Sequence, residues 1–128
     1  LSYMSKTVIK IKNIHVDKRG KIINILNKLF RSCAIITSKK NSVRANHYHK
    51  KDWHYCYLIK GKIEYYYKKR NSKEKTKKII IKEGDLFFTP PMVEHAMKFP
   101  VDSVFITLGK GSRSKINYDN DTHKVDLV

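Results

Sequence analysis

Histidine is the residue type whose spacing in this sequence points most directly to chemistry. Six histidines are present, and three of them, His47, His49 and His54, fall within eight residues. On a β-strand, His47 and His49 point to the same face because side chains alternate with a period of two. Neutral imidazoles bind divalent metals and also act as acids and bases near neutral pH. The cluster predicts a metal site or an acid–base site, the alternative being exposed histidines on a basic protein.

Short β-branched segments surround this cluster and would have to position it. They occupy residues 7–12, 21–26, 32–37, 54–59, 62–67, 77–81, 85–89 and 103–108. Segments of this length, separated by turn residues about every ten positions, predict an all-β sandwich or barrel. A helical turn is expected only within Asn24 to Arg31. At 128 residues the chain is predicted to be one domain, residues 1–128, with a core from about residue 7 to 122.

The net charge of +17, from 28 basic and 11 acidic side chains, raises the question of an anionic partner. Most basic residues are lysines spread between isoleucines and asparagines, which is typical of solvated strand faces and loops. The alternative is an anionic small molecule such as a nucleotide or a phosphorylated sugar. Nucleic acid is not expected as the partner, because no basic–aromatic recognition motif accompanies the charge.

Localisation is predicted from what the sequence does not contain. No apolar run approaches the roughly 18–20 residues of a membrane helix, and no apolar secretion signal opens the sequence. The two cysteines, Cys33 and Cys56, cannot form a disulfide framework and are expected to be reduced thiols. A cytoplasmic protein without a membrane partner is the expectation.

Two spacings resemble the motifs of the cupin superfamily. In the first, His47-Tyr48-His49 is followed by four residues, His54, six residues and Gly61. In the second, Gly84 is followed by five residues, Pro90-Pro91-Met92, two residues and His95. This resemblance implies a single small cupin jelly-roll β-barrel in which His95 joins the other three. It also implies that His47, His49, His54 and His95 can together hold a divalent metal.

A narrower resemblance is to the sugar-nucleotide cupins, the dTDP-4-dehydrorhamnose 3,5-epimerases and the dTDP-4-keto-6-deoxyhexose 3,4-ketoisomerases. The residues that carry it are Asp17-Lys18-Arg19-Gly20, Val43-Arg44-Ala45-Asn46-His47-Tyr48-His49, Pro90-Pro91 with His95, and Tyr118-Asp119-Asn120-Asp121. The Arg44 to His49 element also resembles the zinc-containing epimerase cupin of a bifunctional capsule-sugar reductase. Together these residues span positions 17 to 121.

The narrower resemblance implies an isomerase or epimerase of surface-polysaccharide biosynthesis that acts on a nucleotide-linked 4-keto sugar. Such an enzyme abstracts the proton next to the carbonyl. By position, His47 matches the catalytic base and His49 its catalytic neighbour. Arg44 and Arg19 are candidates to bind the anionic substrate, and Tyr57 to line its pocket. The strand tyrosine of the epimerases is missing from residues 104–108, so the resemblance does not identify the proton donor.

Two other functions stay open at this point. One is a metal-dependent cupin enzyme of another class, an oxygenase or a lyase. The other is a non-catalytic module that binds a sugar or a metal. The cofactor expected is a divalent ion, Zn, Fe, Ni, Mn or Cu, and no organic cofactor is expected. A homodimer is expected because small barrels have open sheet edges, with the strand Thr7 to Lys12 as the exchange element.

Overall fold

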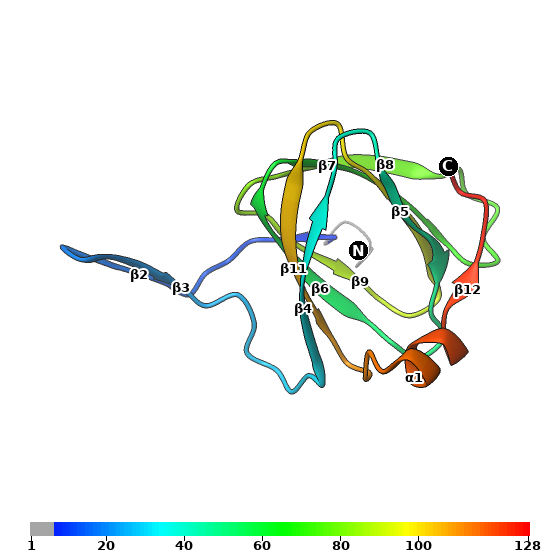
Figure 1. Cartoon of the computed structure of the whole chain (residues 1–128), viewed down its shortest axis with the longest axis horizontal. Coiled ribbons are helices and arrows are strands. Elements are labelled where there is room, and N and C mark those ends of the chain that lie inside the picture. The colour runs from blue at the N-terminus through cyan, green and yellow to red at the C-terminus, as the bar shows by residue number, and fades with distance from the viewer. Residues whose placement is uncertain (1–6) are drawn as a thin grey trace.

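Two five-stranded antiparallel sheets face each other and form a jelly-roll barrel (Figure 1). The structure is a computed structural model that describes residues 7–128. One sheet has the order β1 (Val8–Ile9), β9 (Leu86–Thr89), β6 (His54–Lys60), β11 (Ser103–Gly109) and β4 (Ser32–Ser38). The other has the order β12 (His123–Lys124), β5 (Val43–Tyr48), β10 (Val93–Lys98), β7 (Lys62–Lys69) and β8 (Lys77–Lys82). The predicted all-β jelly roll is confirmed.

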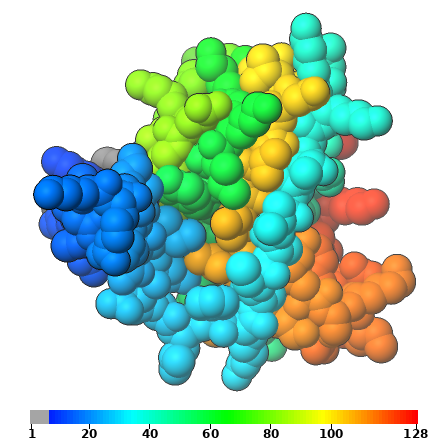
Figure 2. All heavy atoms as spheres, turned by 60° about the vertical axis from the view of Figure 1, so that its left-hand side comes forward, coloured from blue at the N-terminus to red at the C-terminus, as the bar shows by residue number. Residues whose placement is uncertain are grey.

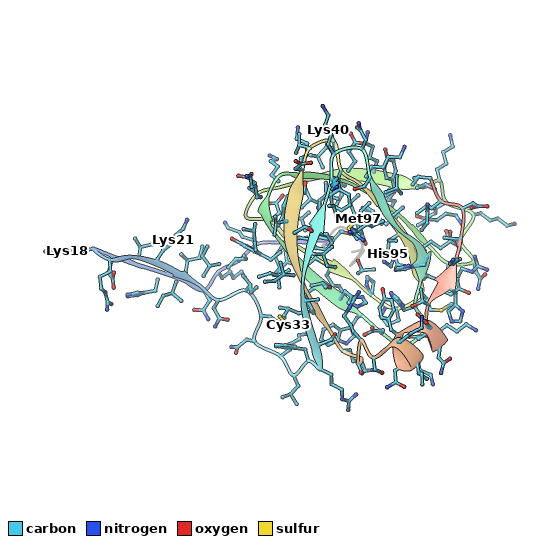
Figure 3. The ribbon with its side chains drawn as sticks, viewed as in Figure 1. Lys18, Lys21, Cys33, Lys40, His95 and Met97 are labelled. Atoms are coloured by element: carbon cyan, nitrogen blue, oxygen red, sulfur yellow. The ribbon has the colours of Figure 1, made fainter. Side chains whose placement is uncertain are left out.

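Alternation along the strands places histidines and apolar side chains on the same inward faces. In β6, His54 and Cys56 line the interior, and Leu58, two residues further along, is fully buried. In β10, His95 and Met97 both point into the barrel (Figure 3). Residues two apart on a strand share a face, so each of these strands carries an imidazole and apolar side chains into one interior.

The apolar part of the interior is the hydrophobic core. Its largest fully buried side chains are Tyr65, Phe87, Phe99, Phe105, Leu58, Ile63 and Ile81. Burial of one such aliphatic or phenylalanine side chain contributes about 1.5–3 kcal/mol. This core lets the same strands hold polar side chains at fixed positions.

A two-stranded hairpin stands apart from the barrel. It consists of β2 (Ile14–Asp17) and β3 (Gly20–Ile23), and Figures 1 and 2 show it as an arm at one side of the molecule. At its tip, the Asp17 carboxylate accepts a hydrogen bond from the backbone N–H of Arg19 and pairs with its guanidinium at 2.6 Å. Within the arm, β2 and β3 pair with each other, and most of their side chains are exposed to solvent.

The position of the helix differs from the prediction. Residues 24–31 form no helix, because this segment crosses from the arm to β4 and packs Ile25 and Leu26 against the outer face of a sheet. The one helix of residues 7–128 is α1 (Lys115–Asn120), which is too short to show a helical period in the sequence. No helix within residues 7–128 has both the length and the apolar character needed to cross a membrane.

Gly61→Ala is expected to destabilise the barrel. Gly61 connects β6 to β7 with a φ of 103°, and an added methyl group would lie 2.7 Å from the carbonyl oxygen of Asp102. The left-handed backbone and this clash should together lower the free energy of unfolding by more than about 1 kcal/mol, measured by urea denaturation. Gly84→Ala is the matched control, since Gly84 has a φ of 87° but nothing within 4 Å of the added carbon. Equal losses in the two variants would contradict the steric explanation.

Candidate active site

Four histidines from three parts of the barrel meet in one place. His47 lies in β5 and pairs in register with His95 of β10, and their ring centroids are 4.7 Å apart. His49, two residues after His47, has its ring centroid 4.7 Å from that of His47 and 5.1 Å from that of His54. One ring nitrogen from each of His47, His49 and His95 falls within 4.8 Å of the others. The structure brings together all four histidines that the sequence singled out.

An irregular backbone in β5 aims these side chains. Ala45 and Asn46 both have positive φ, 71° and 56°, and the pairing of β5 with β10 shifts register here. Asn46 holds the unusual conformation because its side-chain oxygen accepts hydrogen bonds from the backbone N–H groups of Leu127 and Val128. A bulge of this kind re-aims the residues that follow it, and His47 is the next residue.

Backbone carbonyls orient two of the four imidazoles. The Nδ1–H of His49 donates to the carbonyl oxygen of Asp121 at 2.8 Å, and the Nδ1–H of His95 donates to that of Val93 at 3.0 Å. Carbonyl oxygens only accept, so Nδ1 carries the proton and Nε2 keeps its lone pair in the neutral rings. Within residues 7–128, no hydrogen bond to protein fixes the ring of His47.

Two ring nitrogens are buried without a hydrogen-bond partner. They are Nε2 of His49 and Nε2 of His54, and the latter lies 3.4 Å from the Asp52 carboxylate without a hydrogen bond between them. A buried polar atom left unpaired costs about 1–3 kcal/mol. Of these two histidines, only His49 has a ring nitrogen within 4.8 Å of those of His47 and His95, and such a group of imidazole nitrogens is a donor set that a divalent metal takes.

Burial keeps three of these histidines, His47, His54 and His95, uncharged. It lowers the pKa of His47 to about 2, with neighbouring histidines and Arg113 adding to the effect. Burial likewise lowers the pKa of His54 and that of His95 to about 3. The imidazoles are therefore neutral at pH 7, the state needed both to accept a proton and to bind a metal.

His47, His54 and His95 line a cavity of about 190 Å³ that also holds two arginines. Arg44 reaches it from β5, and its guanidinium donates to the Ser38 hydroxyl at 2.7 Å and to the Thr37 carbonyl oxygen at 2.8 Å. Apolar side chains of the core, including Phe87 and Phe105, complete the wall. The cavity combines neutral bases, positive charge and an apolar wall.

The C-terminal segment contributes Arg113 and Tyr118, which the sequence analysis gave no role. Tyr118 lies in α1, its ring centroid is 5.6 Å from that of His49, and the Arg113 guanidinium lies 4.4 Å from the tyrosine ring. Burial raises the pKa of Tyr118, and the positive charge of Arg113 opposes this shift. The signal in the sequence was the Tyr118 to Asp121 motif, although its side-chain contacts are visible only in the fold.

Two carboxylates fasten this segment to the histidine loop. The Asp121 carboxylate accepts three hydrogen bonds of 2.9–3.0 Å from the backbone N–H groups of residues 50–52, which lower its pKa against the effect of burial. The Asp52 carboxylate accepts the backbone N–H of Gly111 at 2.8 Å. Both ends of the segment that carries Arg113 and Tyr118 are thereby tied to the loop between His49 and His54.

The structure does not bring Arg19 or Tyr57 to this cavity. Arg19 lies at the exposed tip of the arm, where it pairs with Asp17. Tyr57 follows Cys56 in β6, so its side chain points to the opposite face and packs against the cluster around Leu86. Substrate contact by either residue within its own chain has no support from the geometry.

Several solved structures share this fold. The dTDP-4-dehydrorhamnose 3,5-epimerase from Sulfolobus tokodaii matches with a TM-score of 0.69 over 85% of this chain and 70% of its own, at 20% identity. The QdtA 3,4-ketoisomerase from Thermoanaerobacterium thermosaccharolyticum, a double mutant in complex with TDP, matches with a TM-score of 0.70 over 88% of each chain, at 24% identity. Another mutant of that ketoisomerase is in complex with TDP-4-keto-6-deoxyglucose.

A third similar structure is a much longer protein. The capsular polysaccharide assembling protein CapF from Staphylococcus aureus matches with a TM-score of 0.67 and 16% identity. The match covers 89% of this chain and 32% of that one. At such identities the likeness shows a common fold.

Sequence comparison defines the family. No curated protein matches the chain. The family model for the cupin domain matches residues 34–108, more than half of the chain, and this stretch contains all four histidines of the cluster. The chain therefore belongs to the cupin domain family.

Proposed function

We propose that this protein is an isomerase or epimerase that acts on a nucleotide-linked 4-keto sugar by removing the proton next to the carbonyl. The observation that carries the proposal is the neutral imidazole of His47, in the same cavity as the guanidinium of Arg44. Support comes from the similar structures described as a sugar-nucleotide epimerase and a ketoisomerase, one in complex with a TDP-linked 4-keto sugar.

His47 suits the role of base because no hydrogen bond to the described protein holds its ring. His49 and His95 are each held by a backbone carbonyl, whereas the His47 ring is half-buried and lines the cavity. Removal of the proton leaves negative charge on the carbonyl oxygen, and a nearby guanidinium stabilises that charge. Arg44 is positioned for this task, and His49 supports His47 from the adjacent ring.

The size of the cavity decides which part of the substrate enters. About 190 Å³ is less than the roughly 300–1,000 Å³ of pockets that enclose drug-sized ligands. In this proposal the sugar ring enters, and the diphosphate and the base stay at the mouth of the barrel. The net charge of +17 favours recruitment of such an anion. The product would serve surface-polysaccharide synthesis, and the likeness to CapF supports this assignment.

Replacing His47 is expected to abolish proton exchange. In deuterated water, the wild-type protein should exchange the hydrogen next to the carbonyl of a dTDP- or UDP-linked 4-keto sugar, as followed by NMR. His47→Asn should slow this exchange by at least about 100-fold, because it removes the base.

His15→Asn is the matched control, since His15 lies on the arm away from the cavity. Circular dichroism checks that both variants fold. Unchanged exchange in His47→Asn would exclude His47 as the base. Binding of the sugar nucleotide without any exchange by the wild type would instead indicate a non-catalytic sugar-binding module.

A second candidate is a metal-dependent cupin enzyme of another class, such as an oxygenase or a lyase. It is favoured by the three ring nitrogens within 4.8 Å of one another and by the unpaired Nε2 atoms of His49 and His54. His47, His49 and His95, with His54 beside them, would hold Zn, Fe, Ni, Mn or Cu. When bound, such an ion supplies Lewis-acid chemistry. A nitrogen that binds a metal cannot accept a proton, so the two candidates give His47 different roles.

The metal hypothesis predicts stoichiometric binding. Protein purified without an affinity tag should contain close to one divalent ion per chain by elemental analysis. His95→Ala should lower the content at least tenfold. His123→Ala should not change it, because the His123 ring lies beside Tyr48, with the ring centroids 5.1 Å apart, and is not part of the histidine cluster. A wild-type protein that stays without metal after incubation with each of the five ions would rule this candidate out.

We also propose that two copies of this chain associate through the arm. A two-stranded hairpin is only marginally stable alone in water, and this one exposes large apolar side chains. Val16 is 69% exposed and Ile22 is 66% exposed. The outer face of the edge strand β4 offers Ile35, 71% exposed, as an apolar surface of the same kind. β1, part of the expected exchange strand, pairs with β9 of its own chain, and this proposal assigns the association to the arm instead.

Charge on the arm should dissociate this dimer. Val16→Asp is expected to convert a dimer of about twice 15.1 kDa into a monomer, measured by sedimentation velocity. The cause is the cost of burying an unpaired carboxylate in an apolar contact. Val101→Asp, at an exposed turn of the barrel, is the control and should stay dimeric. A monomeric wild-type protein would refute the association.

A further inference from the structure

The proposed reaction needs a proton donor, and the cavity restricts the choice. Strand β11 has no tyrosine, and its Thr107 hydroxyl accepts a hydrogen bond from the Cys56 thiol. The Thr89 hydroxyl shares a hydrogen bond with the Tyr65 hydroxyl in the buried core. Threonine hydroxyls are also far weaker acids than a phenol. Burial raises the pKa of the Cys56 thiol to about 12, which leaves that group a poor donor as well.

Tyr118 is the one phenol among the described residues that line this cavity. Its ring lies 5.6 Å from that of His49 and 6.4 Å from that of His54, on a different element from the strand of His47. The carboxylates of Asp52 and Asp121 fix the segment that carries it. The fold thereby fixes both ends of the segment that places this phenol at the cavity.

We propose that Tyr118 is the proton donor of this isomerase, a role that rests on the proposed function. The C–H bond next to the carbonyl breaks, its proton goes to His47, and its electron pair forms an enolate. The enolate carbon to be protonated then takes the proton of the Tyr118 O–H bond, and a carbonyl group forms again. Solvent removes the proton from His47 and returns one to Tyr118, so the protein ends as it began.

Arg113 would stabilise the phenolate that exists between these steps. Its guanidinium lies 4.4 Å from the centre of the Tyr118 ring, and both residues line the cavity. A cation beside a phenol favours the charged form of that phenol. Arg113 thus acts through Tyr118 and is a positioning residue.

The test separates removal of the proton from its return. In deuterated water, Tyr118→Phe should still exchange the hydrogen next to the carbonyl within about threefold of the wild-type rate, because His47 is intact. Conversion of the 4-keto sugar nucleotide to product should fall at least about 100-fold, since the donor is absent. Tyr57→Phe, on the outer face of the barrel, is the matched control and should keep both rates. Thermal unfolding checks the fold, and Tyr118→Leu serves as a second variant with the same expected split.

The outcomes distinguish this inference from the proposed function. Exchange and conversion by the wild type, with normal conversion by Tyr118→Phe, would overturn the role of Tyr118 alone. Loss of both rates in folded Tyr118→Phe and Tyr118→Leu would also overturn it, because it would make Tyr118 necessary for binding or for proton removal. Absence of exchange by the wild type on every 4-keto sugar nucleotide tried would overturn the proposed function, and the inference with it.

Discussion

Burial of uncharged imidazoles against an apolar core is the constraint on which the site depends. His47, His54 and His95 line one cavity, and burial lowers the pKa of each of them. The backbone meets this constraint by taking up the Nδ1–H groups of His49 and His95 with carbonyl oxygens. It leaves Nε2 of His49 and of His54 without a hydrogen bond to the described protein, and an unpaired buried polar atom costs about 1–3 kcal/mol.

The same constraint explains why an anionic substrate suits the site. An imidazole whose pKa is about 2 is a weak base. In the proposed reaction, a diphosphate at the mouth and negative charge developing on the sugar would both favour the protonated form of His47 and so raise its pKa. The negative charge of the substrate would then make His47 a stronger base as well as favour binding. Arg44 and Arg113 both line the cavity, and in the proposed reaction they would stabilise the enolate and the phenolate.

Local patterns in the sequence predicted eight of the strands, because alternation and turn residues are short-range signals, but the predicted segments did not include β5 and β10, which carry His47 and His95. The spacing of His47, His49 and His54 was visible locally, and the resemblance to the second cupin motif added His95. Period two also predicts the orientation of Tyr57: if His54 and Cys56 face inward, the residue between Cys56 and Leu58 faces outward. Arg113 and Tyr118 were missed because a six-residue helix has no detectable period and its contacts depend on the Asp121 hydrogen bonds, 69–71 residues apart in sequence. The position of the arm likewise depends on the whole fold.

The hydrogen bonds within the site bear on whether His47 is a base or a metal ligand. A ligand histidine is generally oriented by a hydrogen bond from its second ring nitrogen, and His49 and His95 have that feature. His47 lacks it within the described chain, although its ring is close enough to complete a triad. A base that must accept and release a proton gains from the freedom of a ring that no carbonyl fixes. The contrast between the two fixed rings and the free one favours proton transfer as the task of His47.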